Sequence, residues 1–467
     1  MSSSMMGPQE IVEKALQAST ADSCQVIVSE DSDANLRWAG NTLTTNGVSR
    51  SRGVTVISTV GSGNGAAVGV VSRSNPDADA LVEMVRGAED AARRNEPAED
   101  AGPLVTPEQA PSVPGWDDAP VETSIGVFSH LATGLGAAFE RARSTDQLLF
   151  GFASHNLSTT YLGTSAGIRL RHVQPTGKVE INAKSADYAR SAWAGTATAD
   201  FSDVDVAVLD AELSVRLGWA ANQIALDAGS YETILPPSAV SDLMIYAYWT
   251  AAGRDAAEGR TVFSAPGGGT RVGERLTDAK LTLRSDPAAP GLECCPFAVA
   301  GSSSSMSSVF DNGLAMGATD WIRNGELTNL INTRFTAAKT GGAVAPPIDN
   351  LILGAESSGP SLTEMVGGTS RALLLTCLWY IREVDAQTLL LTGLTRDGVY
   401  LVENGEVVGA VNNFRFNVSP VDLLGRMTEI GPTQPCLPRE WSDYFTRAAM
   451  PPVRVDGFLM SSVSQAS

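Results

Sequence analysis

The sequence LTGLTRDGVYLVENGEVVGAVNNFRF (Leu391–Phe416) carries the clearest structural signal in the chain. It predicts three short β-strands, at Thr388–Thr392, Gly398–Glu403 and Glu406–Phe416. Asn404-Gly405 lies between the second and the third of these runs. An Asn-Gly pair between alternating apolar runs is the strongest short-range signal for a β-hairpin, because both central residues of its turn must take positive φ. The sequence therefore predicts antiparallel strands joined by tight turns in this part of the chain.

Size and charge restrict the class of protein. The chain has 467 residues, of which 43% are hydrophobic and 18% are charged. That length favours two or three domains, and the composition allows a large core and argues against wholesale disorder. The formal net charge is −19. Because an acidic surface repels phosphate backbones and anionic lipids, we expect neither nucleic acid nor a membrane as a partner.

No sorting signal is visible in the sequence. The start, MSSSMMGPQE, lacks the basic region and apolar run of a secretory signal peptide, and no run of about 18 apolar residues predicts a membrane span. The five cysteines are an odd number, which fits a reducing compartment better than a disulfide framework. Cys294 and Cys295 are adjacent, and a bridge between them would form a strained ring. We therefore expect free thiols and a cytoplasmic protein.

Hydrophobic periodicity divides the chain into three domains and a linker. Residues 1–94 are predicted as an N-terminal α+β domain, with strands that include Cys24–Glu30 and Leu36–Thr44 between two helices. Residues 95–118 contain five prolines and no apolar periodicity, which indicates a linker or an extended strap. Residues 119–228 are predicted as a small middle domain.

Helices and strands alternate in the rest of the chain as well. The middle domain is expected to contain strands at Gln147–Asn156 and Thr160–Val173, separated at the polar Leu157-Ser158. Residues 229–467 are predicted as a large C-terminal domain rich in antiparallel strands, with a helix at Ser238–Ala257 near its start. The expected fold class is therefore α+β.

Several short sequence motifs, in their order along the chain, resemble those of the TldD/PmbA family, also called modulators of DNA gyrase. The pattern G-x-x-x-D-G-x-x-x-x-E-N-G-E-V-V, which begins at Gly393, resembles the C-terminal signature of that family. G-E-R-L at Gly273, L-R-S-D-P at Leu283 and A-A-K-T-G-G at Ala337 resemble further landmarks. Each motif is weak alone, but together they cover roughly residues 10–460 in the family's order. The resemblance implies a fold of three parts and a relation to zinc peptidases.

The resembled family pairs zinc-peptidase subunits with metal-free partners, so the presence or absence of zinc ligands indicates which of the two this chain resembles. In the zinc-bearing members, H-E-x-x-x-H lies on a helix that corresponds to Ala239–Glu258, which here reads AVSDLMIYAYWTAAGRDAAE. The histidines of the chain are His130, His155 and His172, and none follows them. A catalytic zinc needs three protein ligands and an open position. Cys436 lies near the place of the family's third ligand, but one thiolate alone does not hold zinc, so we expect a structural cysteine and no metal in this chain.

Aromatic residues occupy the helix where the ligands are missing. Tyr246, Tyr248 and Trp249 are predicted either to pack in the core or to contact a partner subunit, since Tyr and Trp bury a large area and still satisfy a polar tip. Arg254, in the turn that follows, is predicted to line a shared cavity. These four residues are the predicted partner-interface or chamber-lining residues, and no catalytic residue is predicted.

Other candidate sites have simpler interpretations. We expect His155 and His172 to be half-exposed strand residues rather than a general base, and His130 to be a packing residue. The Gly-rich loop Ala265–Gly273 lacks the lysine of a P-loop. The serine-rich segment Gly301–Ser308 lacks the G-x-S-x-G context of a nucleophile. The first is predicted as a flexible loop near an interface and the second as a polar loop.

The resemblance implies a PmbA/TldE-like subunit that is inactive alone. It would form a heterodimer with a TldD-like, zinc-bearing subunit and shape the chamber in which small or unfolded peptides are hydrolysed. Zinc is expected in the partner, and no cofactor is expected in this chain. Two alternatives remain open. The chain could be the partner subunit of an amide-hydrolysing or deprotecting pair in specialised-metabolite biosynthesis, or a homodimeric scaffold or binding protein with no hydrolase activity.

Overall fold

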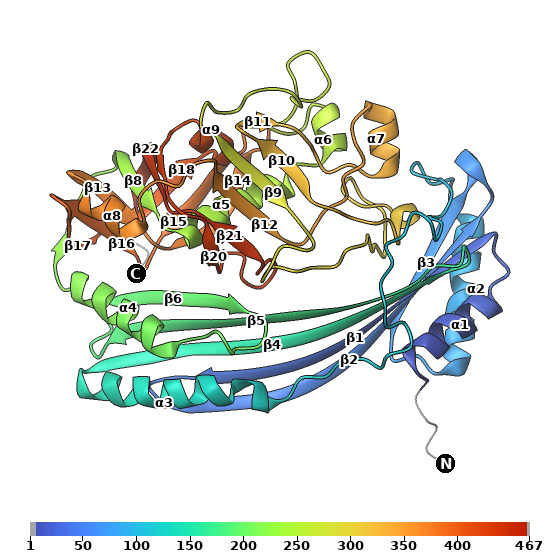
Figure 1. Ribbon diagram of the computed structural model, residues 1–467, viewed down its shortest axis with the longest axis horizontal. Coiled ribbons are helices and arrows are strands. Elements are labelled where there is room, and N and C mark those ends of the chain that lie inside the picture. The colour runs from blue at the N-terminus through green and yellow to red at the C-terminus, as the bar shows by residue number, and fades with distance from the viewer. Residues whose placement is uncertain (1–5, 465–467) are drawn as a thin grey trace.

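A long curved sheet forms the N-terminal half of the molecule, which is a computed structural model that describes residues 6–464 (Figure 1). The sheet has six antiparallel strands in the order β3-β2-β1-β4-β5-β6. Its strands are β1 (Ser23–Trp38), β2 (Leu43–Val60), β3 (Ala67–Ser74), β4 (Gln147–Thr164), β5 (Arg169–Ser185) and β6 (Ser191–Thr198).

Two pairs of helices cover the two ends of this sheet (Figure 1). The helices are α1 (Pro8–Ala18), α2 (Ala78–Arg94), α3 (Ser129–Ser144) and α4 (Val206–Trp219). The side chain of Asp77 accepts from Ala80 N at the start of α2, and that of Asp205 accepts from Ala207 N at the start of α4. Each helix pair has its own hydrophobic core, one around Val12 and Met84 and the other around Leu135 and Leu213.

The strands of this sheet are longer than predicted. β1 is continuous from Ser23 to Trp38, so the expected break between Cys24–Glu30 and Leu36–Thr44 was wrong. In the middle of β1 buried residues alternate with partly exposed polar ones, as on a strand with one covered face. β4 likewise passes through Leu157-Ser158, and the chain reverses only at Gly167, where φ is 97°.

The same sheet contains strands from residues 1–94 and from residues 119–228. β1 pairs with β4 along its whole length, from Gln25 opposite Thr164 to Trp38 opposite Gly151. The two segments predicted as separate domains thus have separate helix layers but share one hydrogen-bonded sheet.

The C-terminal body contains two further sheets and five helices, and one core joins them. A ten-stranded sheet comprises β7 (Gln223–Ile224), β8 (Gly229–Leu235), β13 (Arg371–Leu375), β14 (Leu378–Asp385), β15 (Leu390–Thr395), β16 (Val399–Glu403), β17 (Glu406–Val411), β18 (Phe414–Val418), β19 (Met427–Ile430) and β22 (Val453–Val463). A six-stranded sheet comprises β9 (Leu281–Ser285), β10 (Thr319–Arg323), β11 (Glu326–Leu327), β12 (Leu351–Ala355), β20 (Gln434–Cys436) and β21 (Ala448–Met450). The helices are α5 (Pro237–Trp249), α6 (Gly253–Ala257), α7 (Arg334–Thr340), α8 (Leu362–Gly367) and α9 (Pro420–Leu424). Mixed helices and mostly antiparallel sheets confirm the α+β class.

The predicted hairpin is present. β16 and β17 pair antiparallel across Asn404-Gly405, whose φ values are 53° and 85°. The predicted strand Glu406–Phe416 is divided at Asn412-Asn413, because β17 pairs with β16 whereas β18 pairs with β15 and β22.

Residues 95–118, which we call the strap, connect the long sheet to the C-terminal body. Glu99 forms ion pairs with Arg254 (2.6 Å) and Lys339 (3.2 Å). Asp100 accepts from the hydroxyls of Ser303 and Ser308, both at 2.6 Å. The serine-rich segment therefore anchors the strap. Among the residues that the structure describes, no helix is long and apolar enough to cross a membrane.

A buried polar cluster, the Lys178 cluster, makes a second connection between the sheet and the body. Lys178 on β5 is 6% exposed, and its Nζ lies 3.0 Å from Ser442 Oγ and 3.3 Å from Glu180 Oε1. Ser442 Oγ donates to Glu180 Oε1 at 2.8 Å, and Trp193 Nε1 donates to Glu180 Oε2 at 3.1 Å. Lys178 also pairs with Asp443. The cluster fastens the middle of the sheet to the segment between β20 and β21.

Candidate functional site

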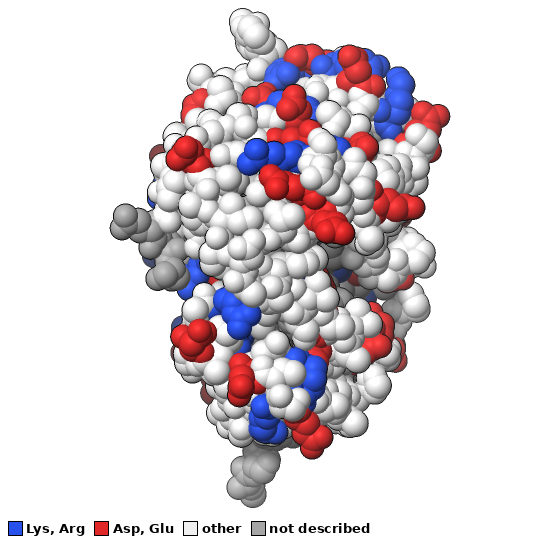
Figure 2. Space-filling view, turned by 90° about the vertical axis from the view of Figure 1, so that its left-hand side faces the viewer, with Lys and Arg blue, Asp and Glu red and all other residues white. Residues whose placement is uncertain are grey.

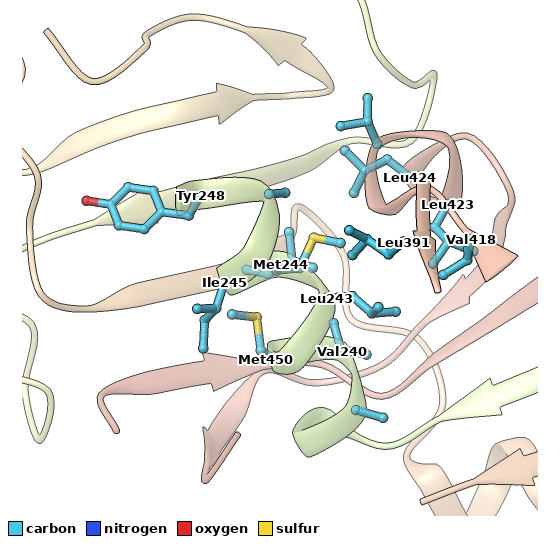
Figure 3. Close-up of a cluster of buried hydrophobic side chains, with 14 of the residues drawn as sticks. Val240, Leu243, Met244, Ile245, Tyr248, Leu391, Val418, Leu423, Leu424 and Met450 are labelled. Carbon is cyan, nitrogen blue, oxygen red and sulfur yellow. The ribbon is translucent and has the colours of Figure 1, made fainter. Parts of the chain in front are cut away.

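The helix α5 is the centre of the candidate site. It spans most of Ala239–Glu258, the segment that corresponds to the H-E-x-x-x-H helix of the zinc-bearing family members. It begins at Pro237 and ends at Trp249, and α6 follows after a break, so the single helix predicted at Ser238–Ala257 was too long. Ten of its 13 residues are buried. A helix that is apolar on all sides is a core helix. Figure 3 shows Leu243 and Met244 packed toward Leu391 and Val418.

The predicted interface residues on α5 lie in different surroundings. Tyr246 and Trp249 are partly buried, and their rings meet that of Trp441 in tilted and edge-to-face arrangements, with centroid distances of 5.6 Å and 5.1 Å. Tyr248 is only 3% exposed, and its hydroxyl donates to Ile348 O and accepts from Ile348 N. Of the two interpretations left open by the sequence, Tyr248 therefore follows core packing. Tyr246 and Trp249 keep some accessible surface.

Arg254 lies on α6 and binds the strap. Its guanidinium pairs with Glu99 and, at 3.2 Å, with Glu258, while its side chain is 31% exposed. Hydrogen bonds from Lys339 and Arg254 lower the pKa of Glu99. These contacts position the strap against the C-terminal body.

A buried carboxyl and a thiol are the titratable groups nearest the centre of α5. Asp242 has no exposed surface, and its Oδ1 accepts from Glu440 N at 2.9 Å. Within residues 6–464, its Oδ2 has no hydrogen-bond partner. Burial raises the pKa of Asp242 well above its ordinary value, and burial raises the pKa of Cys436 to about 12. A hydrogen bond from the side chain of Ser241 opposes the shift of the thiol.

These groups do not fit a zinc ion. A catalytic zinc needs three protein ligands, and Asp242 and Cys436 supply at most two, with Asp242 Oδ1 already accepting from Glu440 N. Across the described part of the chain, no group of three His, Cys, Asp or Glu side chains could hold a metal ion. The donors that surround α5 can therefore pack and hydrogen-bond, but they do not form a catalytic metal site.

Two cavities lie where β5 meets the C-terminal body, and His172 and Gln174 line both. The first has a volume of about 260 Å³ and is lined mostly by apolar side chains, Phe297 and Met306 among them. The second, of about 250 Å³, includes Cys436 in its lining. His172 Nε2 lies 3.1 Å from Gln174 Oε1, and burial lowers the pKa of the ring, so the imidazole is neutral at neutral pH. The cavities combine apolar and hydrogen-bonding side chains with a few charged ones, Asp311 and Asp349 in the first and Asp203, Glu293 and Arg447 in the second.

The other histidines do not line these cavities. His155 is 4% exposed, with Nδ1 2.6 Å from Thr123 Oγ1 and Nε2 2.8 Å from Ala199 O. It is a satisfied core residue, so the expectation of a half-exposed position was wrong for His155 and right for His172. His130 is exposed on α3, and its predicted packing role was wrong.

Sequence reasoning missed Asp242, since a single carboxyl in an apolar run does not reveal whether it faces solvent. It also missed the two cavities, which form between segments more than a hundred residues apart in the sequence. The family resemblance was the feature of the sequence that could have indicated where these cavities lie.

The fold and the α5 region define a chain of the PmbA/TldD type, and comparison with known proteins gives the family. The family model "PmbA/TldA metallopeptidase C-terminal domain" matches residues 228–462, and "PmbA/TldA metallopeptidase domain 1" matches residues 24–92. The chain therefore belongs to the PmbA/TldD metallopeptidase family. No curated protein sequence matches it.

Solved structures agree with this fold. TldE from Thermococcus kodakarensis is similar with a TM-score of 0.77 and 14% identity, over 97% of this chain and 99% of that one. A protein named as a modulator of DNA gyrase from Bacteroides thetaiotaomicron has a TM-score of 0.76 at 14% identity, over 97% and 98% of the two chains. Its counterpart from Thermotoga maritima also has a TM-score of 0.76 at 14% identity, over 96% and 99%. At such identities, the similarity describes the fold.

Proposed function

We propose that this chain is the metal-free subunit of a two-chain zinc peptidase, comparable to TldE in a TldD/TldE-type pair. The observation that carries the proposal is the composition of α5. Where the resemblance places metal ligands, the helix carries apolar and aromatic side chains, and Asp242, its one carboxyl, is fully buried and favours its neutral form. The similarity to TldE over 97% of the chain supports the same assignment.

In the proposed pair, the zinc and the general base belong to a TldD-like partner. This chain supplies walls and substrate contacts, and the cavities lined by His172 and Gln174 are the surfaces that suit this role. Their mixture of apolar and hydrogen-bonding side chains suits the backbone and small side chains of peptide segments. The proposed substrates are small or unfolded peptides, and the proposed location of the pair is the cytoplasm.

Co-expression with a protein that carries H-E-x-x-x-H, encoded beside this chain, tests the proposal. We expect the two chains to co-purify, zinc to be present only in preparations that contain the partner, and peptide hydrolysis to require both. If the purified chain alone binds one zinc per molecule and cleaves peptides, the proposal is wrong. If the chain remains a homodimer in the presence of that protein, the scaffold interpretation replaces it.

Substitution of Trp249 tests, in the same experiment, whether this residue contacts the partner subunit. Trp249→Ala should weaken co-purification, because the partly exposed indole would lose its contact with the partner. Tyr248→Phe is the matched control, since its hydroxyl bonds only within this chain. Unfolding curves of both variants separate a weaker interface from a weaker fold. Unchanged association of a folded Trp249→Ala protein would remove Trp249 from the interface.

A further inference from the structure

A third cavity, which we call the Arg190 cavity, has no residue of α5 in its lining. It has a volume of about 300 Å³ and is formed by the turn between β5 and β6, the segment after α4, and the start of β16. Figure 1 shows α4 and β6 close to β16 and β17 at this end of the molecule. Figure 2 faces the same end, where acidic and basic groups surround a broad uncharged band.

Three buried donors of this cavity lack an acceptor. Within the described residues 6–464, Tyr400 Oη, Asn412 Nδ2 and Arg396 Nε have no hydrogen-bond partner. Tyr400 is 1% exposed. The amide of Asn412 is oriented by its oxygen, which accepts from Leu226 N at 2.7 Å, so its nitrogen remains the free group. Buried polar groups are nearly always paired, so unpaired donors at one cavity call for an explanation.

The charges of the cavity favour an anion. Arg190 and Arg396 both line it, and Asp397 is the one acidic side chain in the lining. Asp397 Oδ1 accepts from Ser191 Oγ, and Oδ2 lies 3.6 Å from Arg396 Nε, beyond hydrogen-bond distance. Arg190 Nη1 donates to Leu217 O at 3.2 Å, which fixes the guanidinium at the end of α4. Two guanidinium groups against one carboxylate leave one surplus positive charge, in a chain whose net charge is −19.

We propose that the Arg190 cavity binds a small carboxylate, either a free organic acid or the C-terminus of a short peptide. A carboxylate presents two acceptor oxygens, which suit a guanidinium fork together with a phenol and an amide. Its single negative charge equals the surplus in the cavity, whereas a phosphate brings more. The volume has room for roughly ten water-sized groups, which is enough for a carboxylate and a short substituent. The site is independent of the metal-free assignment, since it shares no lining residue with the cavities at His172.

Titration calorimetry on the full chain tests the proposal with four probes: acetate, trialanine, trialanine amide and inorganic phosphate. We expect trialanine or acetate to bind and trialanine amide to bind at least tenfold more weakly, because the amide lacks the charged acceptor. Binding of both acids with similar affinity identifies a free small acid as the ligand class. Binding of trialanine alone identifies a peptide terminus.

Substitutions locate the binding. Arg190→Gln should raise the Kd for the bound carboxylate about tenfold or more, and Tyr400→Phe, which keeps the ring, should raise it several-fold. Arg323→Gln is the control, because Arg323 is 62% exposed and pairs with Asp320 on another sheet. The proposal fails if trialanine amide binds as well as trialanine, if phosphate binds more tightly than both acids, or if no acid binds at about 10 mM. It also fails if folded Arg190→Gln and Tyr400→Phe proteins bind like the unchanged chain.

Discussion

Asp242 is a carboxylic acid in apolar surroundings, which disfavour its charged form. A carboxyl at the centre of an apolar helix loses its hydration, and Glu440 N provides one hydrogen bond in return. The fold therefore favours the neutral acid. Tyr248, six residues later, has both hydrogen-bonding capacities of its hydroxyl satisfied by Ile348. These two polar side chains of α5 thus differ: the tyrosine positions a loop, whereas the aspartate makes stability depend on pH.

Asp242→Asn should remove part of that pH dependence. Because the folded-state pKa of Asp242 is raised, its contribution to stability is fully present below the pKa of an unfolded aspartate, near 4, and declines as pH rises above it. The slope from one such group is at most about 1.4 kcal/mol per pH unit. The asparagine stays neutral and can still accept from Glu440 N. In urea unfolding from pH 4 to pH 8, the free energy of unfolding of the variant should therefore increase relative to that of the original protein as pH rises.

The control for this measurement is Asp79→Asn, at an exposed position in the first turn of α2. Its stability across the same pH range gives the baseline for removal of an exposed carboxyl. Parallel curves for Asp242→Asn and the original protein would show that Asp242 is ionised in the folded state, contrary to the effect of its burial.

The elements of the fold differ in how far the sequence predicted them. The hairpin β16–β17 was predictable because Asn404-Gly405 encodes the turn locally, through the positive φ that both residues accept. β1 was not. Its central Asp31 and Asp33 resemble a loop, but they alternate with the buried Ser32 and Ala34 once both edges of the strand are paired. Local composition records the polarity of such residues but not the pairing that makes them a strand.

The turn of this hairpin requires glycine at position 405. A Cβ there would lie 2.6 Å from Gly367 O, and φ is 85°. Gly405→Ala should therefore lower the free energy of unfolding by about 1–3 kcal/mol. Gly136→Ala is the matched control, since Gly136 lies on α3 with no atom within 4 Å of the added Cβ. That change should stabilise the chain by about 0.5–1 kcal/mol, because alanine favours a helix.

Denaturant unfolding of both alanine variants gives the comparison. Equal stability of Gly405→Ala and the original chain would mean that the turn relaxes without cost. A loss of stability in Gly136→Ala would contradict the helical, open surroundings of that glycine.

At the scale of the whole molecule, the long sheet and the C-terminal body are held together by the strap and by the Lys178 cluster. The ion pairs of the strap are largely exposed and contribute little individually. The Lys178 cluster is different, since Lys178 and Glu180 are each 6% exposed and satisfied by Ser442 and Trp193. Removing one charge from such a pair leaves the other buried and uncompensated.

Lys178→Met should therefore destabilise the chain by about 3–5 kcal/mol. The double variant Lys178→Met, Glu180→Gln should recover part of that loss, because the remaining group is neutral and can still accept from Trp193. Lys14→Met, which removes an exposed ion pair with Glu10, should leave stability nearly unchanged. Thermal or denaturant unfolding measures all three. A double variant no more stable than Lys178→Met would show that the loss comes from packing of the lysine stem.

The three-part organisation was predictable from composition and from the proline-rich strap, but the continuity of the long sheet was not. No local pattern specifies that β1 pairs with β4, because the pairing depends on how two distant segments fit. The Arg190 cavity could not be predicted for the same reason, since Arg190, Arg396 and Asn412 come from separate turns. The expectation of a metal-free chain rests on which residue types are present, and it stays a prediction.

The pairing of β1 with β4 also has a consequence for synthesis on the ribosome. More than a hundred residues lie between Trp38 and Gln147, so β1 and β2 can form a hairpin well before β4 has been made. At cellular rates of translation, the free edge of β1 is exposed for roughly 5–20 s. Charged side chains on a strand edge oppose pairing with a second nascent chain. Asp31 and Asp33 lie in the part of β1 that remains unpaired until then, and Asp33 accepts a hydrogen bond from Asn156 once β4 has paired.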